Sequence, residues 1–109
     1  MYVATIGRRT GNPHEIEIWF GMNDSTVYLL AGDAAKSDTV RNVQANPNVR
    51  IRIGGRRFAA NGRILGSGKE DVLARRLLLE KYEPTYSGDL KEWGDTALPV
   101  AFDLGDEIA

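Results

Sequence analysis

Hydrophobic and polar positions alternate along much of the first 65 residues with the period of two that is typical of β-strands. The stretch from His14 to Met22 follows this alternation, and its apolar face consists of Ile16, Ile18, Phe20 and Met22. Thr26 to Ala31 is rich in β-branched and aromatic residues and follows a turn-forming Asn-Asp-Ser cluster. We therefore predict that the two stretches pair as a hairpin, with Phe20 in the core.

A second pair of strands is predicted between residues 48 and 65. Asn48 to Ile53 places its apolar residues on one face and two arginines on the other. Arg56 to Leu65 returns as the partner strand, and Gly54-Gly55 between them is a strong two-residue hairpin signal. Glycine suits this turn because it adopts positive φ without steric cost.

Two helices are predicted, one short and one longer. The short helix begins at Ser37 or Asp38, either of which can cap it, and ends before Asn46-Pro47. The longer helix has Ser67 as its N-cap in a Ser-Gly-Lys-Glu capping box and runs to about Tyr82.

The apolar stripe of the longer helix would comprise Val72, Leu73, Leu77, Leu79 and Tyr82. A last strand is expected from Val100 to Leu104, with Pro99 at its start.

These elements predict one mainly β (α+β) domain over residues 1–109, because no repeat or linker divides the chain. A sheet of this size must protect its edges, and closure into a small antiparallel barrel does so. Small barrels that bind cofactors often dimerise around the ligand, so we expect a homodimer.

The residue inventory argues against several kinds of chemistry. The absence of cysteine excludes disulfides and thiolate sites. His14 is the only histidine and has no companion at ligand spacing, so we expect it to be a surface residue rather than part of a metal site or a hydrolytic triad. An enzyme of this composition would take its reactive atom from a cofactor. No apolar run reaches the roughly 20 residues of a membrane span, and no signal-peptide pattern is present, so we expect a cytoplasmic protein.

Charge is distributed unevenly although the net charge is only −1. The first 65 residues carry nine Arg and Lys against five Asp and Glu, and the remaining residues carry five against ten. The best anion site is the turn Gly7-Arg8-Arg9-Thr10-Gly11, because its glycines expose backbone N–H groups and arginine binds phosphate in a bidentate manner. An ordinary solvated turn is the alternative interpretation.

A second basic set lies on the strands between residues 50 and 63. Its members are Arg50, Arg52, Arg56, Arg57 and Arg63. The chain is not net basic, and no aromatic residues interleave these arginines, so we interpret them as a solvated strand face and expect no nucleic-acid partner.

Three aromatic residues are candidates for ligand contact. Trp19 lies on the polar face of its strand, where an outward tryptophan suggests an interface or a ring-stacking surface. Tyr82 and Tyr86 flank Pro84, and each hydroxyl can donate to a substrate. Packing at the end of the helix is the alternative for the two tyrosines.

Three segments of the chain resemble the deazaflavin-dependent nitroreductase family. Thr5 to Pro13, followed by Ile18-Trp19-Phe20, is similar to the family's "TTxGRxSGxP…LWF" opening. Residues 42–49 resemble its "NLxANPxV" segment, and residues 81–86 followed by 98–100 resemble its tyrosine segment and last strand. The resemblance covers nearly the whole chain in order.

The resemblance implies a split β-barrel of the flavin-reductase and pyridoxamine-phosphate-oxidase type. It implies an oxidoreductase that transfers a hydride from reduced coenzyme F-420, a deazaflavin, to a quinone, nitro or activated-alkene acceptor. The phosphate end of the cofactor would be held by Arg8, Arg9, Thr10 and Gly11, its tail would lie near Asn42, and its ring would lie beside Trp19 and Gly32. Tyr82 and Tyr86 would line the substrate pocket. Contact with a membrane surface would be needed only for a quinone acceptor.

Two positions depart from the family pattern. The loop after the strand at 26–31 is short and contains Asp33 where the family has a Ser-Lys-Gly-Gly stretch, which leaves Lys36 as a substitute for its lysine. Thr39 stands where the family has a tryptophan. FMN in the same barrel and a non-catalytic binder of flavin or another ligand therefore remain open as alternatives.

Overall fold

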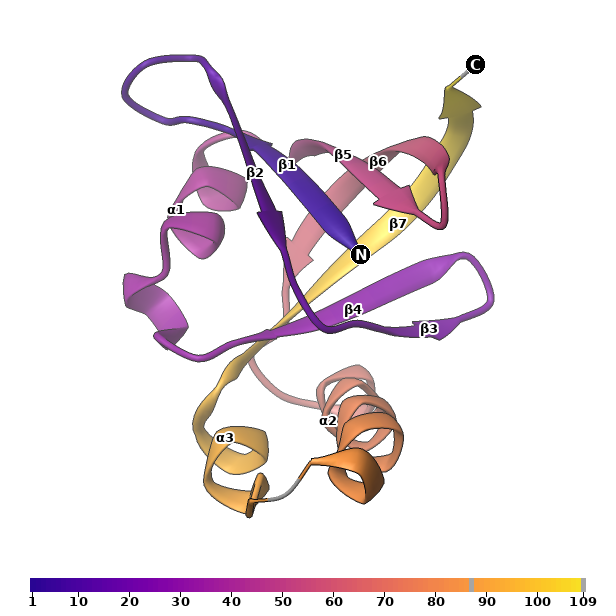
Figure 1. Cartoon of the computed structure of the whole chain (residues 1–109). Coiled ribbons are helices and arrows are strands. Elements are labelled where there is room, and N and C mark those ends of the chain that lie inside the picture. Colours follow the sequence, from indigo (N-terminus) through magenta and orange to yellow (C-terminus); the bar gives the residue numbers. More distant parts are fainter. Residues whose placement is uncertain (87, 109) are drawn as a thin grey trace.

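The computed structural model describes residues 1–86 and 88–108, which form one antiparallel sheet and three α-helices (Figure 1). The strands are β1 (Tyr2–Ile6), β2 (Pro13–Glu17), β3 (Gly21–Asn23), β4 (Thr26–Ala31), β5 (Asn48–Ile53), β6 (Arg56–Ile64) and β7 (Leu98–Ile108). The helices are α1 (Asp38–Ala45), α2 (Lys69–Tyr82) and α3 (Lys91–Thr96), with 3₁₀ turns at Ala34–Lys36 and Glu83–Thr85.

The strands pair in the order β2-β1-β5-β6-β7-β4-β3, so β2 and β3 form the two edges of the sheet. These edge strands are consecutive in the chain, and residues 18–20 join them across the open side of the curled sheet (Figure 1). The Ile18 N–H donates to the Met1 carbonyl at 2.9 Å, which holds the start of this joint against β1. The barrel is therefore bridged by the chain itself at its open side.

Local sequence signals account for the β5–β6 hairpin and for α1. Gly54 and Gly55 have φ of +57° and +85°, as a two-residue turn with both central residues at positive φ requires. The Ser37 side chain caps α1 by accepting from the Val40 N–H at 3.4 Å, and α1 ends at Ala45, before Pro47.

The sheet has a hydrophobic core on each face. β4 shows why, because alternate residues of one strand enter different cores: Leu29 packs with Val40 of α1, whereas Leu30 packs with Leu78 of α2. A strand that is buried on both faces has a continuous apolar sequence, which is what TVYLLA is. α1 therefore covers one face of the sheet, and α2 with α3 covers the other (Figure 1).

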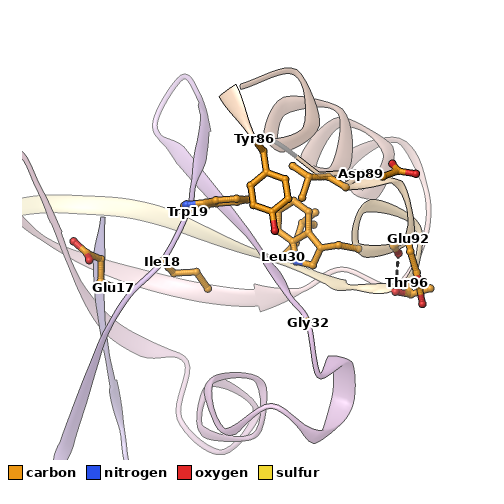
Figure 2. A pocket seen from close by; sticks show the side chains of 11 residues that line it. Glu17, Ile18, Trp19, Leu30, Gly32, Tyr86, Asp89, Glu92 and Thr96 are labelled. Atoms are coloured by element: carbon orange, nitrogen blue, oxygen red, sulfur yellow. Dashed lines mark hydrogen bonds between the residues drawn. The ribbon is translucent and has the colours of Figure 1, made fainter. Parts of the chain in front are cut away.

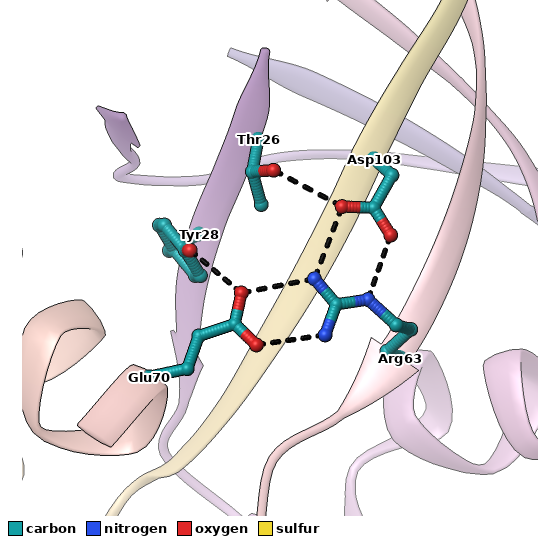
Figure 3. A network of polar contacts seen from close by, with 5 residues as sticks. All are labelled: Thr26, Tyr28, Arg63, Glu70 and Asp103. Carbon is teal, nitrogen blue, oxygen red and sulfur yellow. Dashed lines mark hydrogen bonds and ion pairs between the residues drawn. The ribbon is translucent and has the colours of Figure 1, made fainter. Parts of the chain in front are cut away.

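A polar network attaches the start of α2 to the sheet (Figure 3). The Arg63 guanidinium donates to both oxygens of Glu70 at 2.7 and 2.9 Å and to both oxygens of Asp103 at 2.7 and 3.0 Å. Glu70 also accepts from the Tyr28 hydroxyl at 2.8 Å, and Asp103 accepts from Thr26 at 3.0 Å. Hydrogen bonds from Arg63 hold the pKa of Glu70 and of Asp103 below their usual values, while burial and then the bond to Glu70 raise the pKa of Tyr28 to about 12.

The prediction of one strand from His14 to Met22 is wrong. The chain leaves the sheet between Glu17 and Gly21, and β2 pairs with β1 while β3 pairs with β4. No described element covers the outer side of β2, so Ile16 remains 37% exposed. Phe20 is half-buried under Lys81 instead of in the core.

The start and the buried face of α2 also differ from the prediction. Gly68, with φ of +94°, is the N-cap in place of Ser67, because the Glu70 carboxylate that a capping box requires is bound by Arg63 and Tyr28. Val72 is 63% exposed, because the buried face of α2 begins at Asp71, one position before Val72. The buried residues of α2 are Asp71, Ala74 and Leu78.

Two further elements exceed what the pattern predicted. α3 was not predicted, because its six residues contain a glycine and no apolar period. β7 begins at Leu98 and extends to Ile108, and it pairs with β6 beyond Leu104 after a bulge between Phe58 and Ala60. The partner strand β6, rather than the apolar pattern, decides how far β7 continues.

Candidate cofactor and substrate site

The arginine-containing turn between β1 and β2 is anchored to α1 by Asn42. Asn42 is 3% exposed, and its Oδ1 accepts from the Arg8 backbone N–H at 3.2 Å and from Arg8 Nη1 at 2.9 Å. Its Nδ2 donates to the hydroxyl of Thr5 at 3.1 Å. Asn42 therefore uses its polar atoms inside the protein and fixes the direction of the Arg8 side chain.

A cavity of about 330 Å³ lies beside this anchor, between the turn and α1. Its lining comprises Thr5, Gly7, Arg8, Arg9, Thr10, His14, Ile16, Asp38, Thr39 and Asn42. We call it the basic cavity. A Cβ at Gly7 would lie 2.7 Å from His14 Nε2 and 2.9 Å from the Thr10 hydroxyl, so only glycine allows both side chains to lie against the turn.

The two arginines of the basic cavity have different surroundings. Arg8 is partly buried, and its Nη2 forms an ion pair with Asp38 at 3.1 Å. Arg9 is exposed at the rim. Gly11 has φ of +75° at the tip of the turn, and its N–H donates to the Gly7 carbonyl at 2.8 Å. The Arg8 guanidinium is thus held in place by Asn42 and Asp38, whereas the Arg9 side chain is exposed to solvent.

A second cavity, of about 750 Å³, opens between the β2–β3 joint, the end of β4 and α3 (Figure 2). Its lining comprises Glu17, Ile18, Trp19, Leu30, Gly32, Tyr86, Asp89, Leu90, Glu92, Trp93 and Thr96. We call it the aromatic cavity. Its volume lies within the range of roughly 300–1,000 Å³ that small-molecule sites occupy.

Four aromatic rings meet at the aromatic cavity. Trp19 stacks on Tyr82 with ring centroids 4.4 Å apart and an interplanar angle of 6°. Tyr86 and Trp93 each approach Trp19 edge-on at 5.7 Å. Offset-stacked and edge-on pairs are the arrangements that aromatic quadrupoles favour, so the rings hold one another in place.

The end of α2 holds the joint between β2 and β3 in its bent path. The Tyr82 hydroxyl accepts from the Phe20 N–H at 3.0 Å, and Lys81 Nζ donates to the Phe20 carbonyl at 3.0 Å. Lys81 also lies 3.5 Å from the centroid of the Phe20 ring. These contacts take the backbone groups of Phe20 out of the sheet and turn Trp19 toward the aromatic cavity.

The structure assembles most of the predicted site residues into these two cavities. Arg8, Arg9, Thr10 and Asn42 line the basic cavity, and Trp19, Gly32 and Tyr86 line the aromatic cavity. Tyr82 supports Trp19 from behind. Gly11 and Lys36 are exposed and are not among the lining residues of either cavity.

Sequence reasoning missed the part of the aromatic cavity that α3 and the loop before it provide. Asp89, Glu92 and Trp93 belong to this part, and Glu17 of β2 also lines the cavity. The second tryptophan in an acidic segment was the only local signal for it. His14 is an exposed strand residue, as predicted, yet it also lines the basic cavity.

Among residues 1–86 and 88–108, no group of three or more His, Asp or Glu side chains is placed to hold a metal ion. Within the same residues, no helix is long and apolar enough to cross a membrane.

Comparison with known proteins decides the family. The sequence model of the F-420H(2)-dependent quinone reductases matches residues 1–104. The chain belongs to this family. It is therefore an oxidoreductase whose cofactor is coenzyme F-420, and the resemblance drawn from the sequence motifs is confirmed. No curated protein matches the sequence of this chain.

Solved structures agree on the fold. The conserved hypothetical protein Rv2991 from Mycobacterium tuberculosis matches 97% of the reductase and 72% of its own chain, with 22% identity and a TM-score of 0.77. An F-420-H2-dependent reductase (FDR-A) matches over 95% and 91%, with 21% identity and a TM-score of 0.74. A structure described as a domain-swapped dimer matches over 95% and 78%, with the same identity and TM-score. The predicted split-barrel fold is thereby confirmed.

Proposed function

We propose that the reductase binds F-420 along β2, with the anionic tail in the basic cavity and the ring in the aromatic cavity. When bound there, the reduced cofactor would supply a hydride to a quinone, nitro or activated-alkene acceptor held in the aromatic cavity. The observation that carries this proposal is that the edge strand β2 contributes to both cavities. Ile16 lines the basic cavity, and its neighbour Glu17, whose side chain points to the opposite face of the strand, lines the aromatic one. A ligand that passes around this edge would meet guanidinium groups at its anionic end and aromatic side chains at its flat ring.

The groups present fit such a cofactor. Arg8, Arg9 and Thr10 supply guanidinium and hydroxyl donors for phosphate oxygens. A Cβ built at Gly32 would have Trp93 Cδ1 at 3.9 Å as its nearest contact, so a larger side chain there would enter the space beside the rings. The absence of a side chain at Gly32 keeps that space open for a flat ring.

When bound, reduced F-420 supplies the hydride, and the protein's residues position it. Trp19, braced by Tyr82, offers a fixed aromatic surface to the ring. Leu30 and Trp93 supply apolar surface to the cavity wall, which would shield one side of a bound ring from water. We assign to the Tyr86 hydroxyl the donation of a hydrogen bond to the acceptor oxygen, since Tyr86 is 49% exposed and lines the cavity entrance. Alignment of the two reactants is the main catalytic contribution.

The test is a binding titration of the purified protein with F-420 and, separately, with FMN. Arg8→Ala and Arg9→Ala should each weaken F-420 binding by about 10- to 150-fold, which corresponds to roughly 1.5–3 kcal/mol for a charge-assisted hydrogen bond. Arg76→Ala is the matched control, because Arg76 is 62% exposed on α2 and lies away from both cavities. Unchanged F-420 affinity in both cavity variants would reject the assignment of the tail, and tighter binding of FMN would favour the flavin alternative.

Three further aspects belong to the same proposal. We infer a homodimer, supported by the related structure that is described as a domain-swapped dimer. We also infer a cytoplasmic enzyme, since no described helix could span a membrane. A quinone acceptor would require only peripheral contact with a bilayer. Light scattering of the purified protein tests the first of these inferences.

A further inference from the structure

The charge of the aromatic cavity is opposite to that of the basic cavity. Three carboxylates line the aromatic cavity, from Glu17, Asp89 and Glu92. Its described lining includes no lysine, arginine or histidine. The basic cavity has two arginines and a histidine against one aspartate. The two ends of the proposed cofactor site therefore differ in sign.

The carboxylates flank the aromatic rings instead of clustering at one point. Figure 2 shows Glu17 on one side of Trp19 and Tyr86 and Asp89 and Glu92 on the other side, and all three residues are exposed, so their carboxylates lie at the rim of the cavity. Asp89 is held in place because its Oδ1 accepts from the Lys91 N–H at 2.9 Å. Glu17 lies opposite Tyr2 of β1, and its nearby carboxylate raises the pKa of the Tyr2 hydroxyl.

Aromatic faces and carboxylates attract the same kind of ligand. The electron-rich face of a tryptophan or tyrosine ring attracts a cation, and three negative charges strengthen that attraction. An anionic group in the same cavity would meet repulsion, and no positive side chain of the described lining would offset it.

We propose that the aromatic cavity selects the electron acceptor by charge and prefers cationic aromatic acceptors to anionic ones, with Glu17, Asp89 and Glu92 as the specificity-determining residues. This inference rests on the proposed function, because it places the acceptor in the aromatic cavity. The reaction is balanced as follows: reduced F-420 gives a hydride to the acceptor and is itself oxidised, and the acceptor takes one proton from solvent to complete its reduction. The carboxylates exchange no electrons or protons in this step.

The experiment uses three naphthoquinones that differ in one substituent: none, a trimethylammonium group or a sulfonate. The measurement is kcat/KM for each with saturating reduced F-420, at low and at high ionic strength. The ratio of the cationic to the anionic substrate should exceed about tenfold at low salt and should fall as salt screens the carboxylates. Glu92→Gln should reduce the ratio by about three- to tenfold, and Glu17→Gln/Glu92→Gln should reduce it further.

Comparing the ratio between variants removes the intrinsic difference in reactivity between the substrates. Glu80→Gln is the matched control, since Glu80 is 68% exposed on α2 and does not line the aromatic cavity. A wild-type ratio at or below one, or a ratio that Glu17→Gln/Glu92→Gln leaves unchanged, would overturn the inference. If the wild-type protein fails to reduce even the unsubstituted quinone, the proposed function fails instead, so the two failures are distinguishable.

Discussion

Asn42 is the residue whose replacement tests the architecture of the basic cavity most directly. It is 3% exposed and makes three hydrogen bonds, two from Arg8 and one to the Thr5 hydroxyl. Asn42→Ala removes all three. At about 1 kcal/mol net for each bond, the free energy of unfolding should fall by about 3 kcal/mol. For a domain of this length that corresponds to a decrease in Tm of roughly 10–15 °C.

Urea unfolding followed by far-UV circular dichroism measures this loss, and Asn61→Ala provides the matched control. Asn61 is exposed, and its amide donates to Asn48 Oδ1 at 3.3 Å on the surface, so its removal should cost no more than about 0.5 kcal/mol. If Asn42→Ala costs no more than Asn61→Ala, the buried anchor does not stabilise the fold as argued.

A double mutant separates positioning from direct contact with the cofactor. Asn42 acts through Arg8, because its polar atoms bond to Arg8 and Thr5. Loss of F-420 affinity in Arg8→Ala/Asn42→Ala should therefore equal the loss in Arg8→Ala alone. Additive losses would show that Asn42 contacts the cofactor itself and that its role as an anchor of Arg8 is secondary.

The network around Arg63 predicts two pH dependences. Arg63 lowers the folded-state pKa of Glu70 and of Asp103, so their contribution to stability is present above pH of about 4–5 and is lost as the pH falls through the lowered values. Arg63→Gln should therefore reduce the loss of stability between about pH 5 and 2, as measured by urea unfolding. Parallel stability curves for the variant and the wild type over this range would contradict the prediction. The pKa of Tyr28 is raised to about 12, so its contribution is present below pH of about 10 and declines toward 12. Tyr28→Phe should cost about 1 kcal/mol at pH 7 and weaken the decline in stability above pH 10, which urea unfolding at the two pH values measures. Tyr86→Phe removes an exposed hydroxyl and should leave the stability at pH 7 unchanged.

Much of the fold could be predicted because its signals are local. Alternation places Val49 and Ile51 on the buried face of β5, and Gly54-Gly55 marks the turn that follows. Ser37 marks the start of α1 for the same reason, since a cap acts within one turn of the helix. Such signals depend only on neighbours in the sequence, and tertiary contacts did not override them here.

The β2–β3 joint could not be predicted because distant residues cause it. The alternation continues without interruption through Ile18 and Phe20, so the sequence indicates one strand. The break depends on the Tyr82 hydroxyl and the Lys81 ammonium group, which bind the backbone of Phe20 from about 60 positions away. Periodicity identifies residues that share a face, but it does not show whether another element covers that face.

The carboxylates of the aromatic cavity that come from α3 and the loop before it could not be predicted for a related reason. α3 is held by α2 rather than by its own sequence, since Arg75 Nη1 donates to the Gly94 carbonyl at 2.7 Å. A Cβ at Gly94 would lie 2.7 Å from Leu79 Cδ1, so a larger residue there would displace the Leu79 side chain between the two helices. Because α3 was not predicted, the sequence did not indicate that Asp89 and Glu92 line a cavity.

The uneven distribution of charge along the sequence corresponds to a difference in charge between the two cavities. The basic first part supplies Arg8 and Arg9 to one cavity, and the acidic second part supplies Asp89 and Glu92 to the other. In the proposed binding mode, only one orientation of a ligand with an anionic tail avoids placing its negative charge against carboxylates. In the proposed binding mode, the same difference in charge would orient the cofactor by its tail and would select acceptors at its ring. Replacing Glu17 and Glu92 by glutamine should consequently reduce the preference for cationic over anionic acceptors. Arg8, held by Asn42, should still fix the direction of the cofactor in these variants.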